Sequence, residues 1–346
     1  MTPADHRAVR HAEAMARRPS PFPVSLPWPV LTRAEALRAG VTPGRLRAGD
    51  ITRLRPGLLT RDGRTGTESE IASAYCRTEP GAVAVGLTAA RLQGMPLPDH
   101  LGSRSTSRRP RVHLSLPHGR VGSDAVVRWH QFVLAPSDVR RALYAVEPLE
   151  TDAALLAAPV RLTTRARTWR DLAAHLSSFW LIAIGDHLVR RPRPDLENGR
   201  TEPWCTIAEL REQCTGRHAA ALSSALDAVR VGADSPRETL LRLAFARAGL
   251  PEPLLNVPLI APDGTELHEP DFQWPAHRVC AEYDGRTHST PDQVSKDIRR
   301  ARRAAAAGWV EVRLHTGDVE RRCAPAIEQV RAALAAREQE GGQGGR

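Results

Sequence analysis

The sequence contains no apolar run that approaches the roughly 18–20 residues needed to span a bilayer, so no membrane association is expected. Its charged, polar N-terminus lacks the apolar segment of a secretory signal. It has only five cysteines, an odd number with no CxxC pair, which argues against a disulfide framework and against a zinc ribbon. These absences favour a protein of the reducing cytoplasm.

Lysine is almost missing as well: Lys296 is the sole lysine, and every other member of the 49 Lys and Arg is arginine. Such a preference is also typical of a GC-rich genome, which would explain arginine in place of lysine but not the excess of base over acid. The formal net charge is +10. A strongly basic chain favours a polyanionic partner, and we expect DNA.

The length of 346 residues predicts two or three domains, and the patterns indicate a multidomain α/β protein. Residues 1–27 have no periodicity and are expected to be a flexible arm. Residues 28–66 show two short helix patterns with capping signals and then a hairpin around a Pro-Gly pair, which is typical of a winged helix-turn-helix. Four arginines of this segment are candidate DNA contacts: Arg45, Arg47, Arg53 and Arg55. The alternative is a small helical cap with solvated arginines.

The central part of the chain shows no catalytic constellation. Residues 67–192 combine helix and strand patterns and predict an α/β domain, and residues 193–234 predict a Pro-rich linker followed by bridging helices. The histidines His113, His130 and His187 have no metal-ligand spacing and are interpreted as structural or surface residues. Residues 235–335 form the last predicted domain, and residues 336–346 are expected to be a disordered tail.

The last domain opens with a helix predicted from Ser235, where serine serves as N-cap and Glu238 falls in the first turn. A hairpin is predicted over residues 266–285. With its turn at Ala276-His277, Asp271 lies directly opposite Glu282, and Asp284 shares their face because side chains on a strand alternate.

Three carboxylates on one face repel one another unless something neutralises them. A divalent cation would do so, and Mg²⁺ prefers such oxygen ligands. Paired carboxylates also serve glycosidases, but the basic chain and the lack of a sugar-stacking aromatic cluster disfavour that class. The remaining alternative is a solvated strand face.

Three motifs of this domain resemble the small endonuclease domain related to very-short-patch repair nucleases, in the PD-(D/E)XK superfamily. They are PDFQW (270–274), AEYDGRTH (281–288) and QVSKDIRRARRAAAAGWVEVRL (293–314). The resemblance covers roughly residues 235–320. It implies an α/β/α nuclease core and hydrolysis of DNA phosphodiester bonds with Mg²⁺ (or Mn²⁺).

The resemblance also implies roles for individual residues. Asp271 and Glu282 would be the primary metal ligands, and Glu238 a further ligand or a base that orients water. His288 would be a general acid/base or a phosphate contact. Asp284 would be a ligand or would organise the loop.

One departure concerns the lysine that ends the superfamily signature, because Asp284 stands in its place. Lys296, twelve residues further on, is either a relocated lysine or a solvated helix residue, and His288 is the better candidate for the missing role. Arg286 is a further candidate phosphate contact. Asp297 and Arg300 are expected to hold the helix to the sheet by an ion pair, although Arg300 could also reach a phosphate.

Residues 30–190 resemble the AbiEi-type antitoxins, which pair a winged helix with an α/β domain and act as DNA-binding repressors in type IV toxin–antitoxin systems. The motifs are LTRAEALRAGVTPGRLRAGDITRLRPGLLT, VAVGLTAARLQGMPLP, RVHLSLP and TTRARTWRDLA. The sequence therefore leaves two alternative functions open. The first is a DNA-binding, metal-dependent endonuclease. The second is a non-enzymatic repressor with a possible cognate toxin and an inactive nuclease-like domain.

Overall fold

The computed structural model describes residues 19–61, 63–102, 110–118, 122–147, 155–193, 197–285 and 291–343. It has a mixed α/β fold, as predicted, and forms two compact units. The first unit holds Met1–Gly94 and Asp99–Thr164, and the second holds Met95–Pro98 and Arg165–Arg346. Among the described residues, no helix combines the length and the apolar character required to cross a membrane.

The first unit begins with a three-stranded sheet of order β1-β3-β2, built from β1 (Val30–Thr32), β2 (Ile51–Arg55) and β3 (Leu58–Arg61). Helix α2 (Arg33–Arg38) starts at the predicted capping box, in which Thr32 and Glu35 exchange hydrogen bonds. The second predicted helix is only a 3-10 turn over Arg45–Arg47, since glycines on both sides leave too few residues for a longer helix.

The N-terminal segment that was expected to be a flexible arm is packed in its described part. Leu26 is 4% exposed and belongs to a small core with four other apolar residues: Leu31, Ala36, Val41 and Leu59. Arg61 donates a hydrogen bond to the Leu26 carbonyl, and Phe22 stacks under the guanidinium groups of Arg45 and Arg61.

A five-stranded sheet of order β6-β5-β4-β8-β7 follows in the same unit. Its strands are β4 (Val83–Ala84), β5 (Val112–Ser115), β6 (Val127–His130), β7 (Val139–Val146) and β8 (Leu156–Thr163). The unit also contains the helices α3 (Glu68–Thr78) and α4 (Gly86–Leu92). The long antiparallel pair β7–β8 was not predicted.

The second unit begins with helices α5 (Arg165–Leu172), α6 (Ser178–Val189), α7 (Ile207–Glu212) and α8 (Ala219–Asp227). The main segment of this unit therefore starts at Arg165, whereas a boundary was predicted at residue 192. The physical reason is that α6 packs against α8 and α9 (Pro236–Arg247), the first helix of the last predicted domain.

The remainder of this unit is a four-stranded sheet of order β12-β11-β10-β9. Its elements are β9 (Leu254–Leu255), β10 (Phe272–Trp274), β11 (Val279–Asp284), α10 (Pro291–Ala306), β12 (Val310–His315) and α11 (Glu320–Gln343). Helix α11 thus continues through residues 336–343, where a disordered tail was expected.

The predicted hairpin register is confirmed, because Phe272 pairs with Ala281 and Trp274 with Val279. The turn itself spans four residues rather than two, and Arg278 in it adopts a left-handed conformation with φ of 49°. Strand β12 then pairs parallel to β11 after the crossover through α10.

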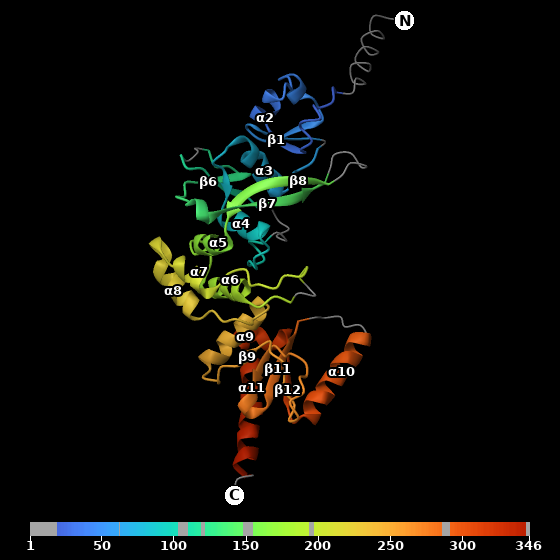
Figure 1. The fold of residues 1–346 in the computed structure, drawn as a ribbon, viewed down its shortest axis with the longest axis vertical. Helices are drawn as coiled ribbons and strands as arrows, with labels where there is room; N and C mark the ends of the chain where they lie inside the picture. Colours follow the sequence, from blue (N-terminus) through green and yellow to red (C-terminus); the bar gives the residue numbers. More distant parts are fainter. Residues whose placement is uncertain are drawn as a thin grey trace, which may run out of the picture. The chain divides into compact units, whose positions relative to one another are not determined.

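This sheet is covered on both faces (Figure 1). One face carries Phe272, Ala281 and Leu314 into a core shared with α9 and α11. The opposite face carries Cys280 into a smaller core with Ala304 of α10. Strand alternation therefore places Glu282 on the side of α10.

Candidate functional site

Asp271 lies directly before β10, and the hairpin register extended by one residue puts it opposite Glu282. Its Oδ2 accepts a hydrogen bond from the Tyr283 backbone N–H at 2.7 Å. Burial raises the pKa of the Asp271 carboxyl to about 7, with further contributions from the negative charges of Glu238 and Glu282. Three of the predicted acids thus act on one another electrostatically.

Glu238 is buried in the first turn of α9, where Ser235 caps the helix as predicted. Its Oε1 accepts a hydrogen bond from Ser235 Oγ at 2.7 Å, and its Oε2 accepts from the Asp234 N–H at 2.8 Å and from Asn256 Nδ2 at 2.7 Å. Burial raises the pKa of this carboxyl too. Because both oxygens already accept protein hydrogen bonds, Glu238 is better placed to orient its neighbours than to bind a metal ion directly.

Glu282 and Asp284 occupy β11 as predicted, Glu282 partly buried and Asp284 exposed at the end of the strand. Glu282 Oε1 lies 3.3 Å from Nε2 of His268, a residue that the sequence analysis did not single out. Glu311 of β12 completes this group. Among the described residues, these three form the one group of potential metal ligands whose ligand atoms all lie within 4.8 Å of one another. The predicted trio of Glu238, Asp271 and Glu282 does not meet that limit.

The charge balance around Asp271 suits a divalent cation. Asp271 is a half-buried carboxyl with a pKa near 7 that lies beside two further acids. The negative charges around it are therefore not balanced by positive charge. Asp271 and Glu282 offer the oxygen ligands that Mg²⁺ prefers, and water supplies much of its remaining shell.

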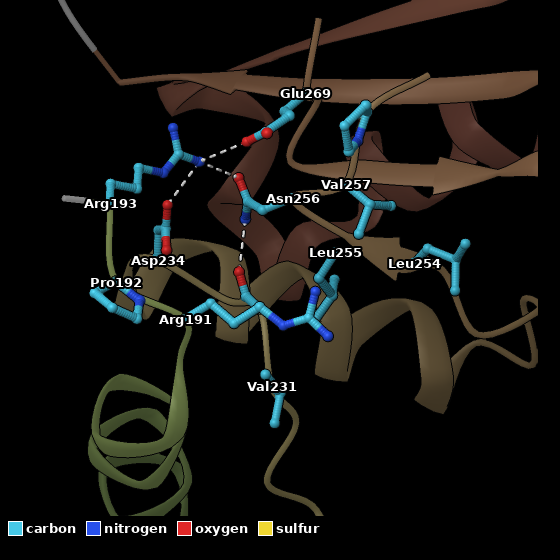
Figure 2. Close-up of a pocket in the computed structure, with 12 residues that line it drawn as sticks. Arg191, Pro192, Arg193, Val231, Asp234, Leu254, Leu255, Asn256, Val257 and Glu269 are labelled. Atoms are coloured by element: carbon cyan, nitrogen blue, oxygen red, sulfur yellow. Dashed lines mark hydrogen bonds and ion pairs between the residues drawn. The ribbon is translucent and has the colours of Figure 1, made fainter. Parts of the chain in front are cut away.

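A cavity of about 700 Å³ lies in the same unit and is lined by Arg193, Asp234, Asn256 and Glu269, among others (Figure 2). Arg193 Nη2 lies at its edge, 2.9 Å from Asn256 Oδ1 and 2.8 Å from Asp234 Oδ2. Asn256, at a φ of 47°, connects this arginine to the site, because its Nδ2 donates to both Glu238 and the Gly232 carbonyl. Its backbone N–H also donates to the Asp271 carbonyl at 3.3 Å.

The predicted DNA contacts fall into two groups. Arg45 forms a two-pronged ion pair with Asp50, and Arg55 donates to Asp124, to the Tyr75 hydroxyl and to the Gly122 carbonyl. The side chains of both arginines are 12% exposed, so they serve the fold. By contrast, Arg47, Arg53 and Arg300 are exposed.

Two predicted residues of the C-terminal site, Arg286 and His288, lie outside the described residues, as does the side chain of Lys296. His268 and Glu311 were missed because their proximity depends on the pairing of β11 with β12. A helical crossover separates these strands in the sequence.

No known family model matches the sequence. Two curated proteins are similar to part of it: "Uncharacterized protein MT2308" of Mycobacterium tuberculosis (strain CDC 1551 / Oshkosh) and "Uncharacterized protein Rv2248" of Mycobacterium tuberculosis (strain ATCC 25618 / H37Rv). Each is 31% identical over 140 residues, which make up 38% of this chain and 51% of the relative. The chain thus spans about half the length of the curated relatives it matches.

Proposed function

We propose that this protein binds DNA and hydrolyses phosphodiester bonds with Mg²⁺ at the site of Asp271 and Glu282. The observation that carries the proposal is the raised pKa of Asp271. Burial and the neighbouring carboxylates of Glu238 and Glu282 raise this pKa to about 7. A protein gains nothing in stability from such a repulsive arrangement, and perturbed acids of this kind cluster at functional sites.

The surrounding fold supports this function. A hairpin, a helical crossover and a parallel strand, with helices on both faces of the sheet, are the parts of the proposed PD-(D/E)XK-like core. We also propose that residues 28–66 act as a winged helix-turn-helix, with the second helix reduced to one turn. Exposed Arg47 and Arg53 and the net charge of +10 suit a phosphate backbone.

The roles of the residues follow from their contacts. Bound Mg²⁺ would activate a water molecule and offset charge on the phosphate. Asp271 would have to lose its proton to serve as ligand, and the N–H of Tyr283 fixes the direction of its carboxylate. Glu238 holds Asn256, and Asn256 in turn positions the guanidinium of Arg193 beside the site, where it could meet a phosphate.

The test is cleavage of supercoiled plasmid and of single-stranded DNA by the full-length chain with Mg²⁺ or Mn²⁺. Asp271→Asn and Glu282→Gln keep the side-chain shapes and are expected to lower the rate by about 100-fold or more. Glu266→Gln, an exposed acid of the same domain, is the matched control and should cleave at the wild-type rate. DNA binding without metal-dependent cleavage of any substrate would refute the enzymatic proposal.

A second candidate is an AbiEi-type repressor whose nuclease-like domain has lost activity. It is favoured by Asp284, which replaces the signature lysine, and by the full hydrogen bonding of Glu238. This function predicts sequence-specific DNA binding that neither variant of the acids alters. Gel-shift titration of the chain on the DNA upstream of its own gene, without Mg²⁺, measures this binding. It separates the two functions because only cleavage by the nuclease requires Mg²⁺.

A further inference from the structure

Three side chains from separate segments converge behind β11. His268 Nε2 lies 3.3 Å from Glu282 Oε1 and 3.7 Å from Glu311 Oε2. His268 comes from the segment that pairs with Leu259, Glu282 from β11, and Glu311 from β12. In the parallel pair, Cys280 is opposite Glu311, so Glu311 and Glu282 point to the same face of the sheet.

The polar atoms of this cluster are buried and incompletely satisfied. The His268 side chain is 5% exposed, and neither of its ring nitrogens makes a hydrogen bond within the described structure. The Glu311 side chain is 9% exposed, and its Oε2 has no hydrogen-bond partner there either. Buried polar atoms in folded proteins are nearly always partnered, so two such atoms facing each other, His268 Nε2 and Glu311 Oε2, point to a ligand bound between them.

The charges of the cluster indicate a cation. Two carboxylates carry two negative charges, and Arg313 offsets one of them because its Nε donates to Oε1 of Glu311 at 2.7 Å. With a neutral imidazole, the form that binds metal ions, one negative charge remains. The hydrogen bond from Arg313 also orients Glu311, as outer-shell partners do for metal ligands.

The distances distinguish between metals. Ligand atoms about 2.1 Å from a tetrahedral ion lie about 3.4 Å apart, whereas neighbouring ligands of an octahedral ion lie about 3.0 Å apart. The separations of 3.3 and 3.7 Å match the tetrahedral value better. Imidazole also suits zinc-like ions and is a poor ligand for Mg²⁺.

We propose that His268, Glu282 and Glu311 bind a zinc-class divalent cation, with the fourth tetrahedral position left to water or to a substrate oxygen. This site is distinct from the proposed Mg²⁺ position at Asp271 but shares Glu282 with it. The inference stands on the cluster alone and does not require cleavage of DNA. Where cleavage does occur, zinc would withdraw Glu282 from the Mg²⁺ site and inhibit the nuclease.

The experiment measures zinc bound by the full-length, chelator-stripped protein, by equilibrium dialysis and elemental analysis. Wild type is expected to bind one equivalent, and Co²⁺ in its place should give the intense visible bands of a tetrahedral ion. His268→Gln and Glu311→Gln should weaken binding at least 10-fold. His277→Gln, which alters another histidine beside a carboxylate, and Cys280→Ser, which removes a nearby thiol, are the matched controls and should retain the ion.

The outcomes are separable from those of the nuclease assay. Asp271→Asn should keep zinc while losing any cleavage. If the wild type cleaves no DNA but the zinc pattern holds, the metal site stands and the enzymatic proposal fails. No stoichiometric zinc on wild type, or equal binding by His268→Gln and His277→Gln, overturns the site and leaves His268 as an ion-pair partner of the two carboxylates. Should His268→Gln fail to fold by circular dichroism, Glu311→Gln provides the same test, because glutamine can still accept the hydrogen bond from Arg313.

Discussion

Asp186 of α6 and Arg242 of α9 form an ion pair of 2.8 Å between side chains that are 1% and 4% exposed. The second carboxylate oxygen of Asp186 accepts the Arg230 backbone N–H, and Thr239 Oγ1 donates to the same oxygen as Arg242. Arg242 also donates to the Ala228 carbonyl. This buried, hydrogen-bonded pair joins helix α6 of the second unit to α9, the first helix of the last predicted domain.

Removing one partner of this pair should be costly. Asp186→Ala leaves the Arg242 guanidinium buried without its counter-charge, and we expect the free energy of unfolding to fall by about 3–5 kcal/mol. Urea denaturation measures the change. Asp263→Ala, in an exposed loop, should shift it far less. A loss below about 1 kcal/mol for Asp186→Ala would contradict this account.

His187, the residue after Asp186, should make the fold acid-sensitive. Burial, followed by the positive charges of Arg190 and Arg165, lowers the pKa of His187 to about 4. The unfolded chain takes up this proton near pH 6.5 and the folded chain does not, so stability is lost as the pH falls from about 6.5 to about 4. The loss should reach about 2–3 kcal/mol and should be absent from His187→Gln. If the free energies of unfolding of wild type and His187→Gln fell in parallel over this pH range, the prediction would be wrong.

Asp271→Asn should stabilise the metal-free protein while removing cleavage. The raised pKa of Asp271 means that wild-type stability is lost as the pH rises from about 4 through about 7. Asparagine has no charge to oppose Glu238, so we expect a gain of about 1–3 kcal/mol at pH 8 and a smaller gain at pH 5. Thermal melting at the two pH values measures it. Glu266→Gln should show no such difference, and a destabilised Asp271→Asn would argue against the repulsive site.

The arginines of the first unit should separate by role. Arg47→Ala and Arg53→Ala are expected to weaken DNA binding and to reduce the slope of log affinity against log salt by about 1 each, since each removes one phosphate contact. Arg45→Ala and Arg55→Ala are expected to lower stability by about 1–2 kcal/mol, because each removes several hydrogen bonds made by a largely buried guanidinium. Fluorescence anisotropy at several salt concentrations, beside urea denaturation, checks both halves. Weaker DNA binding by Arg45→Ala and Arg55→Ala, without a loss of stability, would show that their ion pairs open when DNA binds.

Gly232 should not tolerate a side chain. Its φ is +121°, and an added Cβ would lie 2.8 Å from the Leu255 carbonyl oxygen, so Gly232→Ala should cost about 3 kcal/mol or more. Gly264→Ala is the matched control, because its φ of +84° is also positive but nothing lies within 4 Å of the added atom. It should cost about 1–2 kcal/mol. Equal losses in denaturant would mean that backbone conformation alone decides both positions.

Local rules predicted much of the fold. The capping residues Thr32 and Ser235 start their helices as expected, and the hairpin pairs Phe272 with Ala281 in the predicted register. Such features depend on neighbours in the sequence, so they can be recognised without tertiary information.

What the sequence could not supply depends on long-range pairing. Strands β7 and β8 were missed because several β7 side chains are exposed and give little apolar periodicity. Glu311 joins His268 only through the parallel register of β12 on β11. Arg45 and Arg47 look alike in the sequence, and only the position of Asp50 separates a structural arginine from an exposed one.

Asn256 combines a left-handed backbone with an amide that donates to Gly232 and Glu238 and accepts from Arg193. Few residues satisfy both demands. Glycine adopts this conformation easily but has no side chain, and aspartate adopts it but cannot donate and would add a charge beside Glu238. In a saturation library selected for folding and activity, position 256 should therefore admit asparagine almost alone. Position 193 should retain arginine under the same selection, because its guanidinium pairs with both Asn256 and Asp234 and is the proposed phosphate contact.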